Sequence, residues 1–94
     1  MVKKVAQCLG VVAEDIEGRE QAPHLTTIRY MYWWILHRVR KMSIQQVRRE
    51  TGRSYSYISA GIKHIDDGLE MDDAEVLRLH DRVSELIEQT KKIK

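Results

Sequence analysis

Basic and hydroxyl side chains gather in one stretch of the chain, residues 43–65, which reads SIQQVRRETGRSYSYISAGIKHI. The basic members are Arg48, Arg49, Arg53 and Lys63, and the hydroxyl members are Ser54, Tyr55, Ser56, Tyr57 and Ser59. Cationic side chains bind phosphate oxygens, and hydroxyl groups can donate to and accept from phosphates and base edges. The types and spacing of these residues predict a surface that binds a nucleic acid.

Positive charge is concentrated around this stretch, although the net charge of the whole chain is only +2. Residues 1–65 hold 11 Lys and Arg against 5 Asp and Glu, a net charge of +6, and residues 66–94 hold 5 against 9, a net charge of −4. Between residues 38 and 53, six Lys and Arg accompany a single acid, Glu50. Such a distribution is typical of proteins that bind polyanions.

Two short helices joined by a tight turn are predicted to position these side chains. Ser43 and Gln46 have the spacing of a capping box, so the first helix should begin at residue 44. Gly52 can adopt the left-handed conformation that ends a helix. Ser54 or Ser56 can then cap the second helix.

The second helix carries Ile58, Ile62 and Ile65 at the spacing of a single apolar stripe, which should face inward. Its hydroxyl-rich N-terminal end is then exposed. This is the arrangement of a helix-turn-helix, in which the first residues of the second helix contact base edges and nearby cations contact phosphates. Any antiparallel helical pair with a glycine turn shares the pattern, and that alternative stays open.

The rest of the chain is predicted to be helical and to support this pair. Further helical segments are expected at residues 2–9, 14–17 and 25–42, and the apolar spacing from Val76 to Ile87 marks a closing amphipathic helix capped by Asp72 or Asp73. Gly68 is expected to end the preceding helix. At least one of the paired tryptophans at 33 and 34 should lie in the core. The fold class is therefore all-α, with about five to six helices.

Length and composition indicate one domain over residues 1–94. The chain is 43% hydrophobic and 32% charged, which is ordinary for a soluble helical protein. Its single cysteine, Cys8, cannot form an internal disulfide, so a reducing cytoplasm is the expected location. No run approaches the roughly 18 apolar residues of a membrane span, and the N-terminus does not read as a signal peptide. We expect no membrane partner.

No pattern indicates catalysis or a bound metal ion. The acids between Asp66 and Glu75 lack the alternating order of a calcium loop, so we interpret them as helix caps and solvated loop. The four histidines and Cys8 lack metal-ligand spacing. The sequence contains no nucleophile motif of the G-x-S-x-G type and no phosphate-binding glycine loop. We therefore expect no enzymatic activity, no cofactor and no small-molecule substrate.

Three pieces of the sequence carry a resemblance to a known family. They are VKKVAQCLGVVAEDIEGRE at the start, then IRYMYWWIL, then SIQQVRRETGR with the isoleucine-spaced helix after it. Over nearly its whole length the chain resembles the C-terminal DNA-binding domain of the bacterial replication initiator DnaA. The resemblance implies a Trp-repressor-like helix-turn-helix fold, a double-stranded DNA partner and a nucleoid-associated location in the bacterial cytoplasm. The chain lacks the family's ATPase domain, so it should have no ATPase activity.

The resemblance also implies roles for individual residues. Arg29 matches the arginine at the head of the core helix, where it lies near the DNA backbone or holds the preceding loop. The other implied phosphate contacts are Arg48, Arg49, Arg53 and Lys63. Arg19 falls in the loop that enters the minor groove in the family.

Departures from the family pattern fall on the residues that should read bases. The turn, Gly52 to Ser56, is one residue shorter than the family signature and lacks its aspartate, histidine and threonine. The loop that begins at Arg19 contains an acid and no second arginine. We therefore expect sequence-specific binding that need not target the standard box of the initiator.

A second hypothesis is a protein-interaction module that keeps the fold without reading bases, using Trp34, Tyr55 and Tyr57 as its contact surface. The replacement of charged signature residues by tyrosine and serine motivates it. A weak homodimer is compatible with either function.

Overall fold

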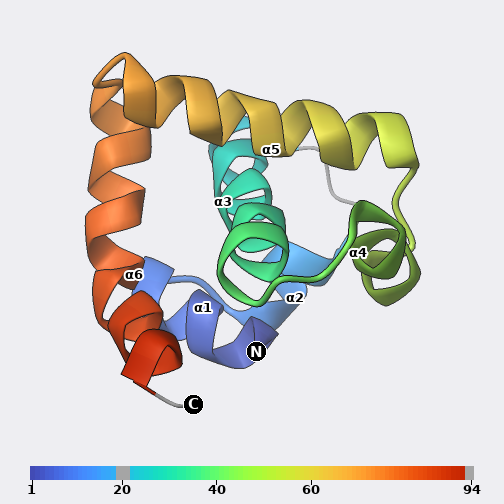
Figure 1. The fold of residues 1–94 in the computed structure, drawn as a ribbon, viewed down its shortest axis with the longest axis horizontal. Helices are drawn as coiled ribbons and strands as arrows, with labels where there is room; N and C mark the ends of the chain where they lie inside the picture. The colour runs from blue at the N-terminus through green and yellow to red at the C-terminus, as the bar shows by residue number, and fades with distance from the viewer. Residues whose placement is uncertain (19–21, 93–94) are drawn as a thin grey trace.

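The computed structural model describes residues 1–18 and 22–92 of the chain. This part forms six α-helices and one π-helical segment and contains no strand, which confirms the all-α class (Figure 1). The elements are α1 (Val2–Leu9), α2 (Ala13–Glu17), α3 (Pro23–Trp34), the π segment η1 (Ile35–Val39), α4 (Ile44–Thr51), α5 (Tyr55–Glu70) and α6 (Ala74–Lys92). The number of segments exceeds the expected five to six because the helix predicted over 25–42 divides into α3 and η1.

Helix α3 forms the centre of the molecule, with α5 crossing it, α6 along one side and α1 and α2 beneath (Figure 1). Its side chains are buried on every face, which is typical of a helix enclosed by others. Both tryptophans belong to the core, with Trp33 1% and Trp34 9% exposed. The expectation that at least one of the two tryptophans lies in the core is therefore confirmed.

The π segment η1 ends the central helix earlier than the sequence predicts. The amide of Arg40 donates to the carbonyl of Ile35 at 3.0 Å, and the amide of Met42 donates to the carbonyl of Leu36 at 3.0 Å. Between these two bonds Lys41 adopts a left-handed conformation with φ 61°. A non-glycine residue rarely takes this conformation, because its Cβ crowds the neighbouring carbonyl.

Helix α5 packs across α3 through the predicted isoleucine stripe. Ile58, Ile62 and Ile65 are all buried, as expected. On the same face Gly61 lies against the rings of Tyr30 and Trp33. A glycine here allows the two helix backbones to approach closely.

Gly68 does not end α5, so this prediction is wrong. The helix continues to Glu70, and Gly68 is buried where α6 packs against it. A Cβ at this position would lie 2.5 Å from Cγ2 of Val76. The glycine makes room for α6 instead of terminating a helix, and the chain turns at Asp72, which has φ 57°.

Helix α6 closes the core as the sequence predicts. The amide of Val76 donates to Oδ1 of Asp73 at 3.1 Å, so Asp73 caps this helix. The Thr27 hydroxyl donates to Oε1 of Glu75 at 2.8 Å and links α6 to α3. The inward residues are Val76, Leu79, Val83, Leu86 and Ile87.

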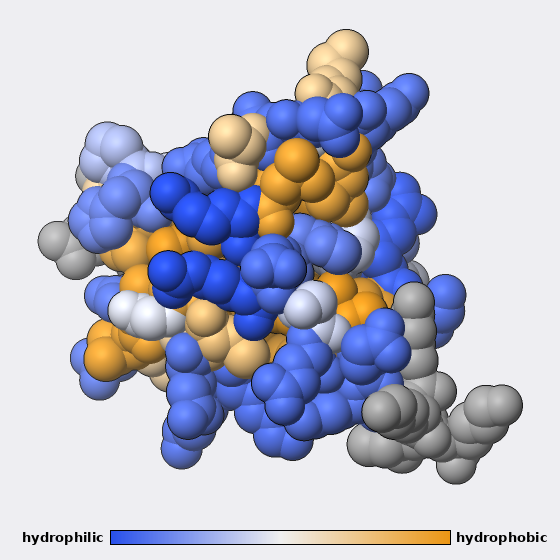
Figure 2. Space-filling view, turned by 90° about the vertical axis from the view of Figure 1, so that its left-hand side faces the viewer, coloured by the Kyte–Doolittle hydropathy of each residue, from blue (hydrophilic) through white to orange (hydrophobic). Residues whose placement is uncertain are grey.

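The side of the molecule on which α6 lies is largely hydrophilic, with apolar patches between the polar side chains (Figure 2). Met71 in the preceding turn and Leu77 on α6 are among the exposed large apolar residues. Among the described helices, none has both the length and the apolar character required to cross a membrane.

Gly61→Ala should destabilise the protein by about 1–2 kcal/mol. A Cβ at residue 61 would lie 2.6 Å from Cδ1 of Tyr30 and 2.9 Å from Cε3 of Trp33. Overpacking typically costs about 1–3 kcal/mol, which exceeds the gain of up to about 1 kcal/mol in helix propensity. Urea unfolding measures the difference. Ser56→Ala on the exposed side of the same helix should change stability by less than about 0.5 kcal/mol, and a stabilised Gly61→Ala protein would contradict the close approach.

Candidate nucleic-acid interface

The first helix of the predicted pair begins where its capping box requires. The amide of Gln46 donates to Oγ of Ser43 at 3.1 Å, and the amide of Ser43 donates to Oε1 of Gln46 at 2.8 Å. Val47 is fully buried and anchors α4 to the core. Arg48 and Arg49 are exposed on the side of α4 away from Val47.

The turn between α4 and α5 is built from Gly52 and Ser54. Gly52 has φ 71°, the left-handed conformation expected at a helix C-terminus. Ser54, rather than Ser56, caps α5, since its Oγ accepts from the amide of Tyr57 at 3.3 Å. The capped end of α5 is therefore held at a fixed distance from α4.

An open hollow of about 610 Å³ lies at this turn. Its lining residues are Arg48, Arg49, Gly52, Arg53 and Ser54. Three arginines thus surround the N-terminal end of a 16-residue helix, whose partial positive charge favours anions. The structure brings together four of the residues predicted from the sequence.

Arg53 also has a structural role that the sequence did not reveal. Its Nη2 donates to the carbonyl of Glu17 at 3.5 Å and to the carbonyl of Gly18. Both carbonyls lie at the C-terminal end of α2, where a cation is favoured by the helix dipole. Arg53 therefore ties the α4–α5 turn to α2 and is half-buried, unlike Arg48 and Arg49.

The two tyrosines at the start of α5 have different surroundings. Tyr55 is 48% exposed, and none of the ring contacts among the described residues involves it. Tyr57 is 40% exposed, and its ring packs edge-on against Trp33 at 5.1 Å and Tyr30 at 6.1 Å between centroids. Burial, together with the adjacent Tyr57, raises the pKa of Tyr30. Tyr57 is therefore held in place by the core, whereas Tyr55 projects from the surface.

The remaining predicted residues of α5 extend the surface along the helix. Ser54 and Ser56 are exposed, and Ser59 is half-buried. Lys63 is exposed about one turn beyond Ser59 and forms an ion pair with Asp67 at 3.2 Å. Pairs of this kind on the surface are weak, so Asp67 competes little with a phosphate for the Lys63 ammonium group.

Among the described residues, the predicted contact Arg29 does not line the hollow at the α4–α5 turn. Arg29 is 5% exposed, and its Nε donates to the carbonyl of Asp15 at 3.0 Å. Arg29 is therefore buried against α2, and its contact with the DNA backbone stays a prediction. Arg19 lies outside the described residues.

Trp34 does not share a contact surface with Tyr55 and Tyr57, because its indole lies against Asp66, further along α5. Its Nε1 donates to Oδ1 of Asp66 at 2.8 Å, and Arg38 donates to Oδ2 of the same carboxylate at 2.6 Å. Asp66 thus joins α5 to α3 and η1. The sequence interpretation missed this contact because the acids from residue 66 onward read as a solvated loop, and 28 residues separate Arg38 from Asp66.

Comparison of the chain with protein-family models, with curated proteins and with solved structures finds no match.

Asp66→Asn should lower stability in a manner that depends on pH. Burial raises the pKa of Asp66, but the hydrogen bonds from Arg38 and Trp34 outweigh it, and the net pKa lies below its ordinary value. A carboxylate whose pKa is depressed in the folded protein stabilises the fold at pH values above the pKa of an aspartate in the unfolded chain, about 3.9. This stabilisation is lost as the pH falls through the pKa that the carboxyl group has in the folded protein.

At pH 7 the free energy of unfolding of Asp66→Asn should be about 1 kcal/mol lower than that of the wild type. The difference is small because the side chain of Arg38 is half exposed to solvent. The two proteins should converge in strongly acidic solution. Urea unfolding across a pH series measures the free energy of unfolding of each protein. A difference between the two that stays constant from neutral to acidic pH would contradict the charged contact.

Proposed function

We propose that the protein binds double-stranded DNA through α4, the following turn and α5, as a helix-turn-helix of the Trp-repressor-like type. The observation that carries this proposal is the open hollow in which Arg48, Arg49 and Arg53 surround the capped N-terminal end of α5. Phosphates bind well at helix N-termini, where amide groups point outward, and adjacent guanidinium groups add charge-assisted hydrogen bonds. The resemblance to the DnaA DNA-binding domain supports the same function.

The N-terminal end of α5 is proposed to enter the major groove. Ser54, Tyr55 and Ser56 are exposed there, on the first turn of the helix, where a second helix of this motif contacts base edges. Arg48 and Arg49 then lie over one phosphate strand, and Lys63 lies further along the helix. Arg53 contributes charge while it fixes the turn against α2.

Base discrimination is proposed to come from a small number of weak contacts. Serine hydroxyls discriminate poorly because they both donate and accept, whereas a bidentate arginine contact with guanine supplies about 1–3 kcal/mol. The proposed target therefore differs from the standard box of the initiator. We propose that these residues have no ATPase activity of their own and act in the bacterial cytoplasm at the nucleoid.

The double variant Arg48→Gln and Arg49→Gln should weaken binding to duplex DNA and reduce its dependence on salt. Each lost phosphate contact should lower the slope of log K against log salt by about 0.9, so the pair should lower it by about 2. Fluorescence anisotropy with a mixed-sequence duplex at several salt concentrations measures the slope.

The matched control for this experiment is Lys3→Gln with Lys4→Gln, which removes the same charge from two exposed positions on α1. The control should retain the wild-type slope. Equal losses in both double variants would show attraction by net charge alone. No binding by the wild-type protein at about 50 mM salt, where non-specific contacts are strong, would contradict DNA binding itself.

Tyr55→Ala and Tyr57→Ala should separate contact with DNA from support of the fold. Tyr55 lies outside the ring cluster, so its removal should weaken DNA binding with a change in stability below about 0.5 kcal/mol. Tyr57 packs on Trp33 and Tyr30, so its removal should also lower stability by about 1–2 kcal/mol. Anisotropy and urea unfolding on the same samples measure both quantities. Unchanged DNA binding by Tyr55→Ala would exclude this side chain from the interface.

A further inference from the structure

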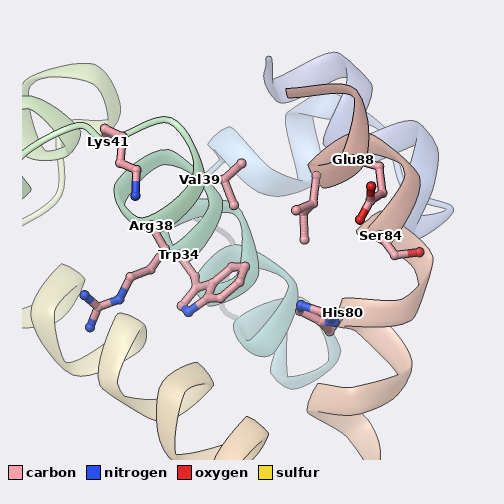
Figure 3. A pocket seen from close by; sticks show the side chains of 8 residues that line it. Trp34, Arg38, Val39, Lys41, His80, Ser84 and Glu88 are labelled. Atoms are coloured by element: carbon pink, nitrogen blue, oxygen red, sulfur yellow. The ribbon is translucent and has the colours of Figure 1, made fainter. Parts of the chain in front are cut away.

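A second hollow, of about 420 Å³, lies between the end of the central helix and α6, away from the arginine-lined turn (Figure 3). It is lined by Trp34, by Arg38 and Val39 of η1, by Lys41, and by side chains of α6 that include His80 and Glu88. Its volume falls within the range of about 300–1,000 Å³ that is typical of small-molecule sites. The proposed DNA contact uses none of these residues.

The inner wall of this hollow is aromatic and rigid. The indole of Trp34 is fixed by its hydrogen bond to Asp66, and the ring of His80 packs edge-on against it at 5.5 Å between centroids. Val39 and Ile87 supply aliphatic surface to the same hollow. A flat apolar group could therefore pack against a preformed surface without reorganising it.

The backbone around the hollow has two uncommon features. The η1 segment is a π-helix, a conformation that is often found at functional sites. Lys41 follows it with φ 61°, a conformation that glycine would adopt at lower free-energy cost. In Figure 3 the ammonium group of Lys41 points toward Trp34 and Arg38. The cation at this left-handed position therefore faces the hollow.

The charges that line the hollow are arranged with opposite signs at its two ends. Arg38 is already paired with Asp66. Within the part of the chain whose side chains the structure describes, neither Lys41 nor Glu88 has an ion-pair partner within 4.0 Å. Figure 3 places Lys41 at one end, beside Arg38, and Glu88 with Ser84 at the other. One end therefore favours an anion, and the other favours a hydrogen-bond donor.

We propose that this hollow binds a small aromatic carboxylate that carries a hydrogen-bond donor at the end opposite the carboxylate. The ring would pack on Trp34 and His80, the carboxylate would accept from Lys41, and the donor would face Glu88 and Ser84. The molecule is bound as a ligand and is not transformed. This site shares no residue with the proposed DNA contact, so an experiment can contradict one of the two proposals and leave the other intact.

The test uses 4-hydroxyphenylacetate as the probe, titrated into ¹⁵N-labelled protein. The chain has two tryptophans, and the indole N–H resonance that disappears in Trp34→Phe identifies Trp34. We expect a saturable shift of this resonance and a smaller one for Trp33, which lies among Tyr30 and Tyr57. No saturable shift of the Trp34 resonance up to several millimolar probe, about the weakest binding that a small site supports, would overturn the proposal.

Two related compounds test the chemistry of the ligand. The neutral 4-hydroxyphenylacetamide lacks the charge, and phenylacetate lacks the donor. Loss of a charge-assisted contact should weaken binding of the amide by at least about tenfold, and loss of the donor should weaken binding of phenylacetate by a smaller factor. Equal affinities for the acid and the amide would overturn the assignment of an anion site.

Two variants of Lys41 separate a ligand contact from a structural role. Lys41→Gln should bind 4-hydroxyphenylacetate at least about tenfold more weakly, whereas Lys3→Gln, on the surface of α1, should bind it as the wild type does. Lys41→Gly should also bind weakly, yet its unfolding midpoint should equal or exceed that of the wild type because glycine relieves the left-handed backbone. Wild-type affinity in both Lys41 variants would overturn the proposed role of this side chain.

Discussion

The structure depends on the burial of α3, because α1, α2, α5 and α6 all pack against it. Helix α5 can cross α3 closely only where Gly61 leaves room for Tyr30 and Trp33. The same crossing is fixed at its other end by Asp66, which accepts hydrogen bonds from Trp34 and Arg38. Two separate contacts with α3 and η1 define the orientation of α5, and the direction in which its N-terminal end points follows from these contacts as well as from the turn.

Local chemistry made much of the fold predictable from the sequence. The capping box at Ser43, the left-handed Gly52 and the isoleucine stripe of α5 depend on neighbours within a few residues, and each was confirmed. Gly68 was misread because a buried glycine that admits a neighbouring helix and a glycine that ends a helix look alike in sequence. The π segment and the contact between Arg38 and Asp66 depend on the packing of distant segments, which no local pattern encodes.

The predicted binding residues also divide into those placed by neighbouring residues in the sequence and those placed by the packing of distant segments. Arg48, Arg49, Arg53 and Ser54 are close in sequence, and the turn brings them around one hollow. Arg29 came from the resemblance, and its environment is decided by α2, which covers it and supplies a carbonyl acceptor. Arg53 lines this hollow and also fixes the turn against α2. Exposure alone therefore does not distinguish a contact residue from a supporting one.

The arginine-lined end of α5 is proposed to contact the DNA duplex. Backbone amide shifts of the ¹⁵N-labelled protein, recorded while a mixed-sequence duplex is added at about 50 mM salt, test it most directly. The account predicts that the largest shifts fall within residues 48–57, which span the last turn of α4, the connecting turn and the first turn of α5. Shifts that leave this segment unchanged and fall on α1 or α6 would contradict it.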